Sequence, residues 1–167
     1  MHQKTQKIVL SSLMAALVCV ATMMIKVPSP MKGYLNLGDG FVLITAWLLS
    51  PFYGFLAAGL GSALADLFSG YIVYAPATFL IKGAMALIAF AFFLLLKSKL
   101  GIFSARLVGA VMAELMMVAG YFVFEGFMYG FVPSAVNIPA NAVQGAAGIV
   151  IGMVFIKAFL KIDFGDR

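Results

Sequence analysis

The sequence predicts an all-α integral membrane protein, a single bundle of six transmembrane helices whose N- and C-termini are cytoplasmic. Composition leads to this prediction: 64% of the 167 residues are hydrophobic, only 10% are charged, and the mean hydropathy is +1.10. Soluble domains carry about 25% charged residues. A membrane-spanning helix needs about 20 mainly apolar residues, so about six helices use the whole chain.

Apolar runs separated by helix-breaking residues define the six helices. The first run follows Lys4 and Lys7, as in a signal peptide, but it is long, has no clear cleavage site and precedes further spans, so we interpret it as a retained helix. Prolines and glycines in KVPSPMKGYLNLGDG mark a long loop, and Ser50-Pro51 marks a tight turn. The predicted helices cover residues 8–25, 41–49, 52–68, 75–96, 106–125 and 138–160, and the predicted outer loops cover 26–40 and 126–137.

The third predicted helix has a stripe of small residues on one face. Gly54, Ala58, Gly61 and Ala65 recur at the spacing of one helix face. Such stripes let two helix backbones approach closely in lipid, so we interpret this one as a packing surface.

The basic residues predict the orientation of the bundle. With the N-terminus inside, most Lys and Arg residues fall at cytoplasmic helix ends, as membrane proteins prefer. The cytoplasmic set is Lys4, Lys7, Lys97, Lys99, Arg106, Lys157, Lys161 and Arg167, whereas Lys26 and Lys32 lie outside and Lys82 lies within the membrane. Nucleic-acid binding is not expected, because it needs a solvated basic face rather than charges at helix ends.

Metal, cofactor and His-based chemistry are not expected. Cys19 is the only cysteine and His2 the only histidine, too few ligands for a zinc or haem site and no base for a catalytic triad. The sequence has no G-x-x-x-x-G-K-[ST] loop for ATP and no clear inverted repeats, which lone carriers usually have. Energy for uphill uptake would therefore come from other subunits.

Ionisable residues within the predicted helices are the first candidates for a binding site, because burying them in lipid costs several kcal/mol. Lys82 lies about two turns into the fourth helix. Glu114 and Glu125 share one face of the fifth helix with Tyr121 between them. Lys82 could pair with one of these acids for structure alone, or it could face a ligand pocket.

Amide side chains line one face of the sixth helix. Asn137, Asn141 and Gln144, followed by Gly148, recur at helical spacing near its outer end. Either interhelical hydrogen bonds or a wet pocket under the outer loops would satisfy them. Amides, one cation and nearby aromatic rings suit a flat heteroaromatic ligand, although another small polar solute would fit the same groups. The aromatic residues are Tyr34, Tyr74, Phe79, Tyr121 and Phe124.

Four segments give the chain a resemblance to a known family. They are YLNLGDG (34–40), LLSPFYGFLAAGLGSALADL (48–67), YAPATFLIKGAMALIA (74–89) and PANAVQGAAGIVIG (139–152). Together they resemble the substrate-binding S components of energy-coupling factor (ECF) vitamin transporters. The resemblance implies a non-enzymatic, multi-pass subunit of the bacterial plasma membrane whose pocket is formed near the outer surface by the first loop and helices four to six. It also implies as partners a transmembrane coupling protein and two ATPase subunits, which supply ATP hydrolysis while the S component topples in the membrane.

The resemblance further implies a partner interface on the first helix. Members of the family present small residues at A-x-x-x-A spacing to the coupling protein. Ser11, Ala15 and Cys19 have that spacing here, with Ser12 and Ala16 beside them, and Cys19 replaces an alanine. A small-residue seam between the chain's own helices would give the same pattern.

Within the family the chain looks most like members for hydroxymethylpyrimidine or pyridoxine-type vitamers, and a riboflavin- or other vitamin-specific S component is the alternative. Asn137, Asn141 and Gln144 would bond the ring edge, and Tyr74 and Tyr121 would stack or cap. Lys82, balanced by Glu114 or Glu125, would meet an acceptor atom. Asn36 to Asp39 would close as a lid. The predicted substrate-binding residues are Asn36, Asp39, Tyr74, Phe79, Lys82, Tyr121, Glu125, Asn137, Asn141 and Gln144.

Two other functional classes stay open from the sequence. A self-sufficient carrier or channel, acting as an oligomer, would move solute across vesicles without ATP. A membrane enzyme with Glu114 or Glu125 as base and Lys82 as electrophile would convert its ligand chemically.

Overall fold

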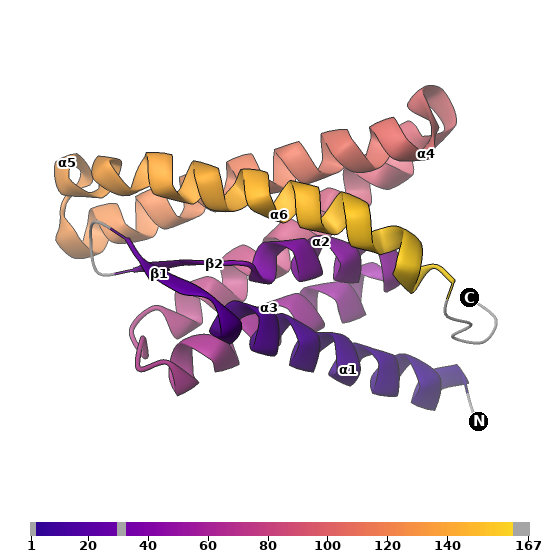
Figure 1. Cartoon of the computed structure of the whole chain (residues 1–167), viewed down its shortest axis with the longest axis horizontal. Helices are drawn as coiled ribbons and strands as arrows, with labels where there is room; N and C mark the ends of the chain where they lie inside the picture. The colour runs from indigo at the N-terminus through magenta and orange to yellow at the C-terminus, as the bar shows by residue number, and fades with distance from the viewer. Residues whose placement is uncertain (1–2, 30–32, 162–167) are drawn as a thin grey trace.

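The structure, a computed structural model, describes residues 3–29 and 33–161. These residues form a bundle of helices with one small β-hairpin (Figure 1). The elements in chain order are α1 (Gln3–Met24), β1 (Lys26–Pro28), β2 (Tyr34–Asn36), α2 (Gly38–Leu48), α3 (Pro51–Phe68), α4 (Ala75–Tyr129), α5 (Phe131–Ser134), the 3₁₀ turn η1 (Ala135–Asn137) and α6 (Ile138–Phe159).

The long element α4 is a hairpin of two helices broken at one residue. Gly101 has φ 78° and ψ 165°, a backbone conformation that glycine adopts without steric cost. The chain reverses there, and the two halves of α4 lie side by side (Figure 1). The two helices therefore extend beyond the predicted bounds of 75–96 and 106–125. A single glycine makes the turn that we had assigned to residues 97–105.

Long apolar helices make up most of the described residues. Four segments are long and apolar enough to cross a membrane: Lys4–Met24, Pro51–Phe68, Ala75–Tyr129 and Phe131–Phe159. Large apolar side chains such as Val20, Leu64, Leu115 and Val150 are exposed on them, as expected for surfaces in contact with lipid. The chain is therefore a multi-pass membrane protein.

Helix α2 differs from the other apolar helices. It has 11 residues, which at about 1.5 Å per residue is too short to cross the hydrocarbon core alone. Nine of the 11 are buried, and α2 packs against α6 and the other helices. We had predicted a transmembrane helix over 41–49, but this segment is a core element whose hydrophobicity reflects enclosure by protein.

The core is filled by side chains from every long helix. Its largest fully buried residues are Met14, Leu43, Ile44, Met85, Met117 and Ile156. Helix α3 packs between α1 and α4, while α6 covers α2 and the second half of α4.

Both predicted outer loops contain regular structure. Residues 26–28 and 34–36 form an antiparallel hairpin in which Val27 pairs with Leu35, and α2 begins at Gly38. Residues 126–129 extend α4, Gly130 (φ 94°) breaks it, and α5 and η1 follow. The loop predictions for 26–40 and 126–137 were thus too long, because prolines and glycines here start or stop short elements.

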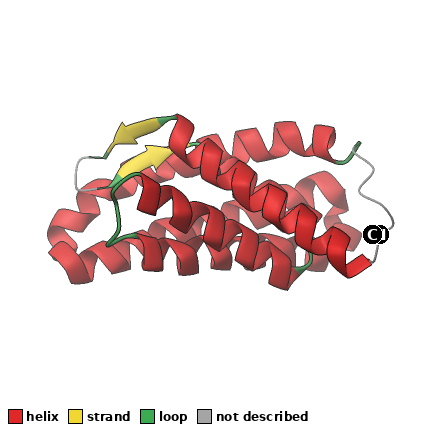
Figure 2. Ribbon diagram, turned by 90° about the horizontal axis from the view of Figure 1, so that it is seen from below, coloured by secondary structure: helices red, strands yellow, loops and turns green. Residues whose placement is uncertain are grey.

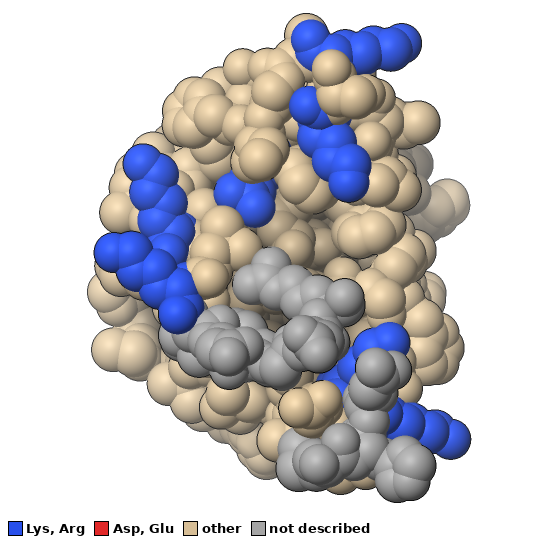
Figure 3. All heavy atoms as spheres, turned by 90° about the vertical axis from the view of Figure 1, so that its right-hand side faces the viewer, with Lys and Arg blue, Asp and Glu red and all other residues tan. Residues whose placement is uncertain are grey.

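The two ends of the bundle differ in composition. The hairpin lies at the end opposite the chain termini (Figure 2). The other end carries the start of α1, the end of α6 and the turn within α4, and this face shows Lys and Arg side chains but no Asp or Glu among the described residues (Figure 3). Exposed basic residues of the helix ends are Lys4, Lys7, Lys97, Lys99, Lys157 and Lys161. His2, Lys32 and Arg167, which entered the sequence predictions, lie outside the described residues.

Candidate ligand-binding site

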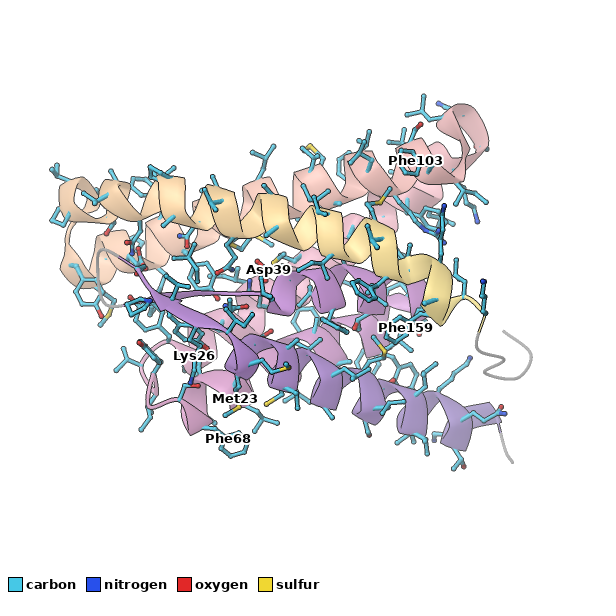
Figure 4. All side chains as sticks on the ribbon, viewed as in Figure 1. Met23, Lys26, Asp39, Phe68, Phe103 and Phe159 are labelled. Carbon is cyan, nitrogen blue, oxygen red and sulfur yellow. The ribbon has the colours of Figure 1, made fainter. Side chains whose placement is uncertain are left out.

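Asp39 is a buried carboxylate at the meeting point of three helices. It is the second residue of α2 and is 0% exposed. Lys82 of α4 pairs with one of its oxygens, and Gln144 Nε2 of α6 donates a hydrogen bond to Asp39 Oδ2 over 2.7 Å. Figure 4 shows Asp39 at the start of α2, inside the bundle. These three side chains, which we call the interior polar cluster, connect α2, α4 and α6.

Close helix packing puts Asp39 in this position. A Cβ added at Gly148 would lie 2.7 Å from Asp39 Cβ, so only glycine lets α6 approach α2 this closely. We had placed Asp39 in the lid, which is wrong, because α2 begins three residues earlier than predicted and carries Asp39 into the core. The sequence left the partner of Lys82 open, with Glu114 and Glu125 as candidates, and the structure pairs it with Asp39 instead.

Gln144 also connects the interior polar cluster to the hairpin. Its Oε1 accepts a hydrogen bond from the Asn36 backbone N–H over 2.9 Å, and Asn36 Nδ2 lies 3.4 Å away. Asn36 Oδ1 in turn accepts from the Gly38 N–H at 2.9 Å, a turn typical of asparagine. One amide side chain thus holds both β2 and Asp39.

Replacing Gln144 with leucine is expected to free the hairpin from α6. The Asn36 N–H would lose its acceptor, so its amide hydrogen should exchange roughly 5- to 10-fold faster, the factor that corresponds to one net hydrogen bond. Hydrogen–deuterium exchange in detergent, followed by mass spectrometry of peptides over 33–37, measures this. Asn141→Ala is the control, because Asn141 is on the same helix and makes no bond to β2 among the described contacts. Equal exchange in wild type and Gln144→Leu would contradict the hydrogen bond's role.

A pocket opens beneath the hairpin, with Gln144 in its wall and Asp39 outside it. Its cavity volume is about 30 Å³, room for about two water molecules. Residues of β2, α3, α4 and α6 and of the adjoining connections form its wall. They are Ser29, Gly33, Tyr34, Asn36, Asp66, Tyr71, Tyr74, Thr78, Tyr121, Glu125, Asn141 and Gln144.

Aromatic rings form a continuous wall of this pocket. Tyr34 and Tyr71 have ring centroids 4.6 Å apart, Tyr71 and Tyr74 are 6.2 Å apart, and Tyr74 meets Phe124 edge-on at 5.3 Å. On α4, the Tyr121 and Thr78 hydroxyls lie 3.0 Å apart. The rings therefore pack on each other while three of their hydroxyls bond to polar side chains of the wall.

Two carboxylates also line the pocket, and tyrosines hold them. Tyr34 donates to Asp66 Oδ1 over 2.7 Å, and Tyr74 lies 3.3 Å from Glu125 Oε1. Asn137 Nδ2 donates to Glu125 Oε2 over 2.9 Å. In the hairpin, burial and then the Asp66 charge raise the pKa of the Tyr34 phenol well above its ordinary value, so Tyr34 remains a donor at neutral pH.

Glu114 is a fourth buried acid, beside the interior polar cluster. It is 5% exposed, neither carboxylate oxygen has a hydrogen-bond partner among the described residues, and Oε1 would contact a Cβ at Gly148. It does not line the pocket. In the part of the chain that the structure describes, no three His, Cys, Asp or Glu side chains are placed to hold a metal ion.

Nine of the ten predicted substrate-binding residues fall into two layers. The first layer lines the pocket: Asn36, Tyr74, Tyr121, Glu125, Asn141 and Gln144. The second lies behind it: Asp39, Lys82 and Asn137 are buried and bond to each other or to the lining. Phe79 instead packs edge-on against Phe55 of α3 at 5.4 Å and does not line the pocket.

The sequence analysis did not select several lining residues. Asp66 is the most informative of them, because it is an ionisable residue within an apolar segment, and that criterion selected Lys82. We had interpreted its helix only as a packing surface. No sequence pattern marked the lining residues Ser29, Gly33, Tyr71 and Thr78. Only the fold brings Thr78 of α4 together with the β1–β2 and α3–α4 connections that carry the other three.

The residues of α1 that we predicted to contact a partner protein lie in two different environments within this chain. Ser12 and Ala16 are exposed, while Cys19 is buried. Ala15 faces α3, where its carbonyl oxygen would be 2.4 Å from a Cβ at Gly61. Within the chain, Ala15 therefore contributes to the small-residue seam between α1 and α3, whereas Ser12 and Ala16 lie on an exposed face.

Comparisons with known proteins agree with this architecture. The family model described as ECF-type riboflavin transporter, S component, matches residues 2–161. The solved structure described as "Structure and mechanism of the S component of a bacterial ECF transporter" is 25% identical, with a TM-score of 0.74 over 96% of this chain and 100% of that one. An uncharacterized protein of Pyrococcus woesei is 35% identical over 136 residues, 81% of this chain and 88% of the relative. The chain belongs to the ECF S-component family and is a substrate-binding subunit of an ECF transporter.

Proposed function

We propose that this S component captures a small heteroaromatic vitamin or precursor, of the hydroxymethylpyrimidine or pyridoxine class, in the pocket beneath the hairpin. The composition of the pocket wall carries the proposal. Amide side chains supply donors and acceptors for the polar edge of a ring, and tyrosine rings stack on its faces. The amides are Asn36, Asn141 and Gln144, and the rings are Tyr34, Tyr71, Tyr74 and Tyr121.

The size of the cavity supports a single-ring ligand. At about 30 Å³ the free space is too small for a vitamin ring, so part of the pocket wall, such as the hairpin, would have to move for a ligand to enter. Only a few hydrogen bonds, chiefly those of Asn36 and Tyr34, hold the hairpin to α6 and α3. A single ring demands a smaller displacement than the three fused rings of riboflavin, which is the alternative ligand.

The distribution of basic residues supports the predicted orientation of the bundle in the membrane. The basic end with both termini would face the cytoplasm, as the positive-inside rule requires, and the pocket would open to the outside. A transmembrane coupling protein and two ATPase subunits would supply the energy, since the sequence has no ATP-binding loop. The exposed pair Ser12 and Ala16 on α1 would contact the coupling protein.

Isothermal titration calorimetry tests the ligand class on detergent-purified protein. Hydroxymethylpyrimidine, pyridoxine and riboflavin are titrated in turn, and we expect binding of one of the single-ring compounds. Asn141→Ala should weaken it roughly 5- to 100-fold, the range for one hydrogen bond in a buried site. Ser12→Ala, on the exposed face of α1, is the control and should not change the affinity.

Other outcomes would point to the alternatives. Binding of riboflavin alone would contradict the proposed ligand class and favour a riboflavin-specific S component. Native mass spectrometry that finds a chemically converted ligand would favour an enzyme. Solute uptake into vesicles that hold only this chain and no ATP would favour a self-sufficient carrier.

A further inference from the structure

The charge of the pocket wall is one-sided. Among the described residues that line it, Asp66 and Glu125 are ionisable acids and none is a Lys or Arg. Neutral amides and tyrosines could bind a neutral ring without these two acids. Burying carboxylates at a ligand site is costly unless something positive balances them.

The nearest buried cation is already occupied. Lys82 pairs with Asp39, and its ammonium also lies 5.5 Å from the centroid of the Tyr121 ring, which lines the pocket. Lys26 is exposed on the hairpin, donates to Ser69 Oγ over 2.9 Å and does not line the pocket. Neither lysine makes an ion pair with Asp66 or Glu125 in the described structure.

Asp66 has an oxygen without a partner. The residue is 5% exposed, its Oδ1 accepts from Tyr34, and its Oδ2 is buried with no hydrogen bond among the described residues. Both oxygens of Glu125, by contrast, have partners in Tyr74 and Asn137. A buried unpaired carboxylate oxygen in a pocket wall is a position for a donor that a ligand brings.

The tyrosine wall favours the same kind of ligand. Tyr34, Tyr71 and Tyr74 present adjoining rings to the pocket that Asp66 and Glu125 line. The faces of aromatic rings attract cations, more strongly where water is excluded. Carboxylates and tyrosine rings together are the usual environment of an organic ammonium or amidinium group.

We infer that the cargo of this S component is an organic cation: a small ring that carries a protonated amine or amidine, which donates to Asp66 Oδ2 while the tyrosine wall covers it. This inference rests on the proposed function and narrows it. Within the pyridoxine class it selects a vitamer with an aminomethyl group over one with a hydroxymethyl group, and within the pyrimidines it selects an amino-substituted ring. It argues against riboflavin, whose ring system is neutral.

Matched ligand pairs test the inference. Pyridoxamine and pyridoxine differ at one substituent, amine against hydroxyl, and benzylamine and benzyl alcohol are a simpler pair with the same difference. All four are titrated calorimetrically into the full-length chain in detergent, so that Lys32, which lies outside the described residues, is present. We expect each amine to bind roughly 10- to 100-fold more tightly than its alcohol, the range for a hydrogen bond between charged groups.

Two variants separate charge from structure. Asp66→Asn keeps an oxygen for Tyr34 but removes the charge, so it should remove the preference for the amines and leave the alcohols within about twofold. Tyr34→Phe removes the hydrogen bond to Asp66 but keeps the charge, so it should weaken both members of a pair alike. Glu125→Gln is a second isosteric variant in case Asp66→Asn does not fold.

The outcomes distinguish this inference from the proposed function. Equal binding of pyridoxamine and pyridoxine, unaffected by Asp66→Asn and Glu125→Gln, overturns the cation and leaves the vitamin class standing. Amine-selective binding of benzylamine without binding of any pyridine or pyrimidine compound supports the cation and overturns the vitamin class. If no amine binds more tightly than its alcohol in either pair, the inference is wrong.

Discussion

Replacing Lys82 with methionine is expected to destabilise the protein by about 3–5 kcal/mol, the cost of breaking a buried ion pair by removing one partner. Lys82 and Asp39 are 3% and 0% exposed at their side chains. The substitution leaves the Asp39 carboxylate in the core with Gln144 as its remaining hydrogen-bond donor. Thermal unfolding in detergent can be followed by a thiol-reactive dye, because Cys19 is the only cysteine and is buried.

A double variant identifies the cause of this loss. Asp39→Asn combined with Lys82→Met removes both charges and keeps an acceptor for Gln144, so most of the lost stability should return. Lys99→Met, at the exposed basic end, is the control and should change stability by less than about 0.5 kcal/mol. If the double variant is as unstable as Lys82→Met alone, lost packing rather than the unpaired charge causes the effect.

The second large effect is expected at the small-residue stripe of α3. A Cβ at Gly61 would lie 2.4 Å from the Ala15 carbonyl oxygen and 2.9 Å from Val18 Cβ. Backbone cannot yield as a flexible side chain can, so Gly61→Ala should push α1 away from α3 and cost about 1–3 kcal/mol. The same dye assay measures the change.

Gly54 provides a matched control on the same stripe. A Cβ there would be 3.8 Å from its nearest neighbour, the Thr45 carbonyl oxygen, which is ordinary contact. Gly54→Ala should therefore be tolerated, or stabilise α3 slightly through the better helix propensity of alanine. Equal losses at the two positions would show that helix propensity or lipid contact, rather than the close approach of α1, sets the cost.

Some features of the site followed from the chain pattern alone. The amide face of α6 placed Asn141 and Gln144 at the pocket, and the ionisable residues in apolar segments indicated a polar interior. The same rule, applied to α3, would have added Asp66. The sequence pattern could not predict which side chains pair. Asp39 and Lys82 are 43 residues apart, and their pairing depends on where α2 begins.

The sequence by itself determined the membrane environment, the approximate helix positions and the family resemblance, because hydrocarbon thickness and backbone hydrogen bonding impose strong, local constraints on each apolar segment. Only the tertiary structure decided that α2 is enclosed by protein, that Asp39 rather than Glu114 or Glu125 meets Lys82, and that Asp66 belongs to the pocket. These facts depend on contacts between distant segments, and glycines such as Gly61 and Gly148 set how closely the helices approach.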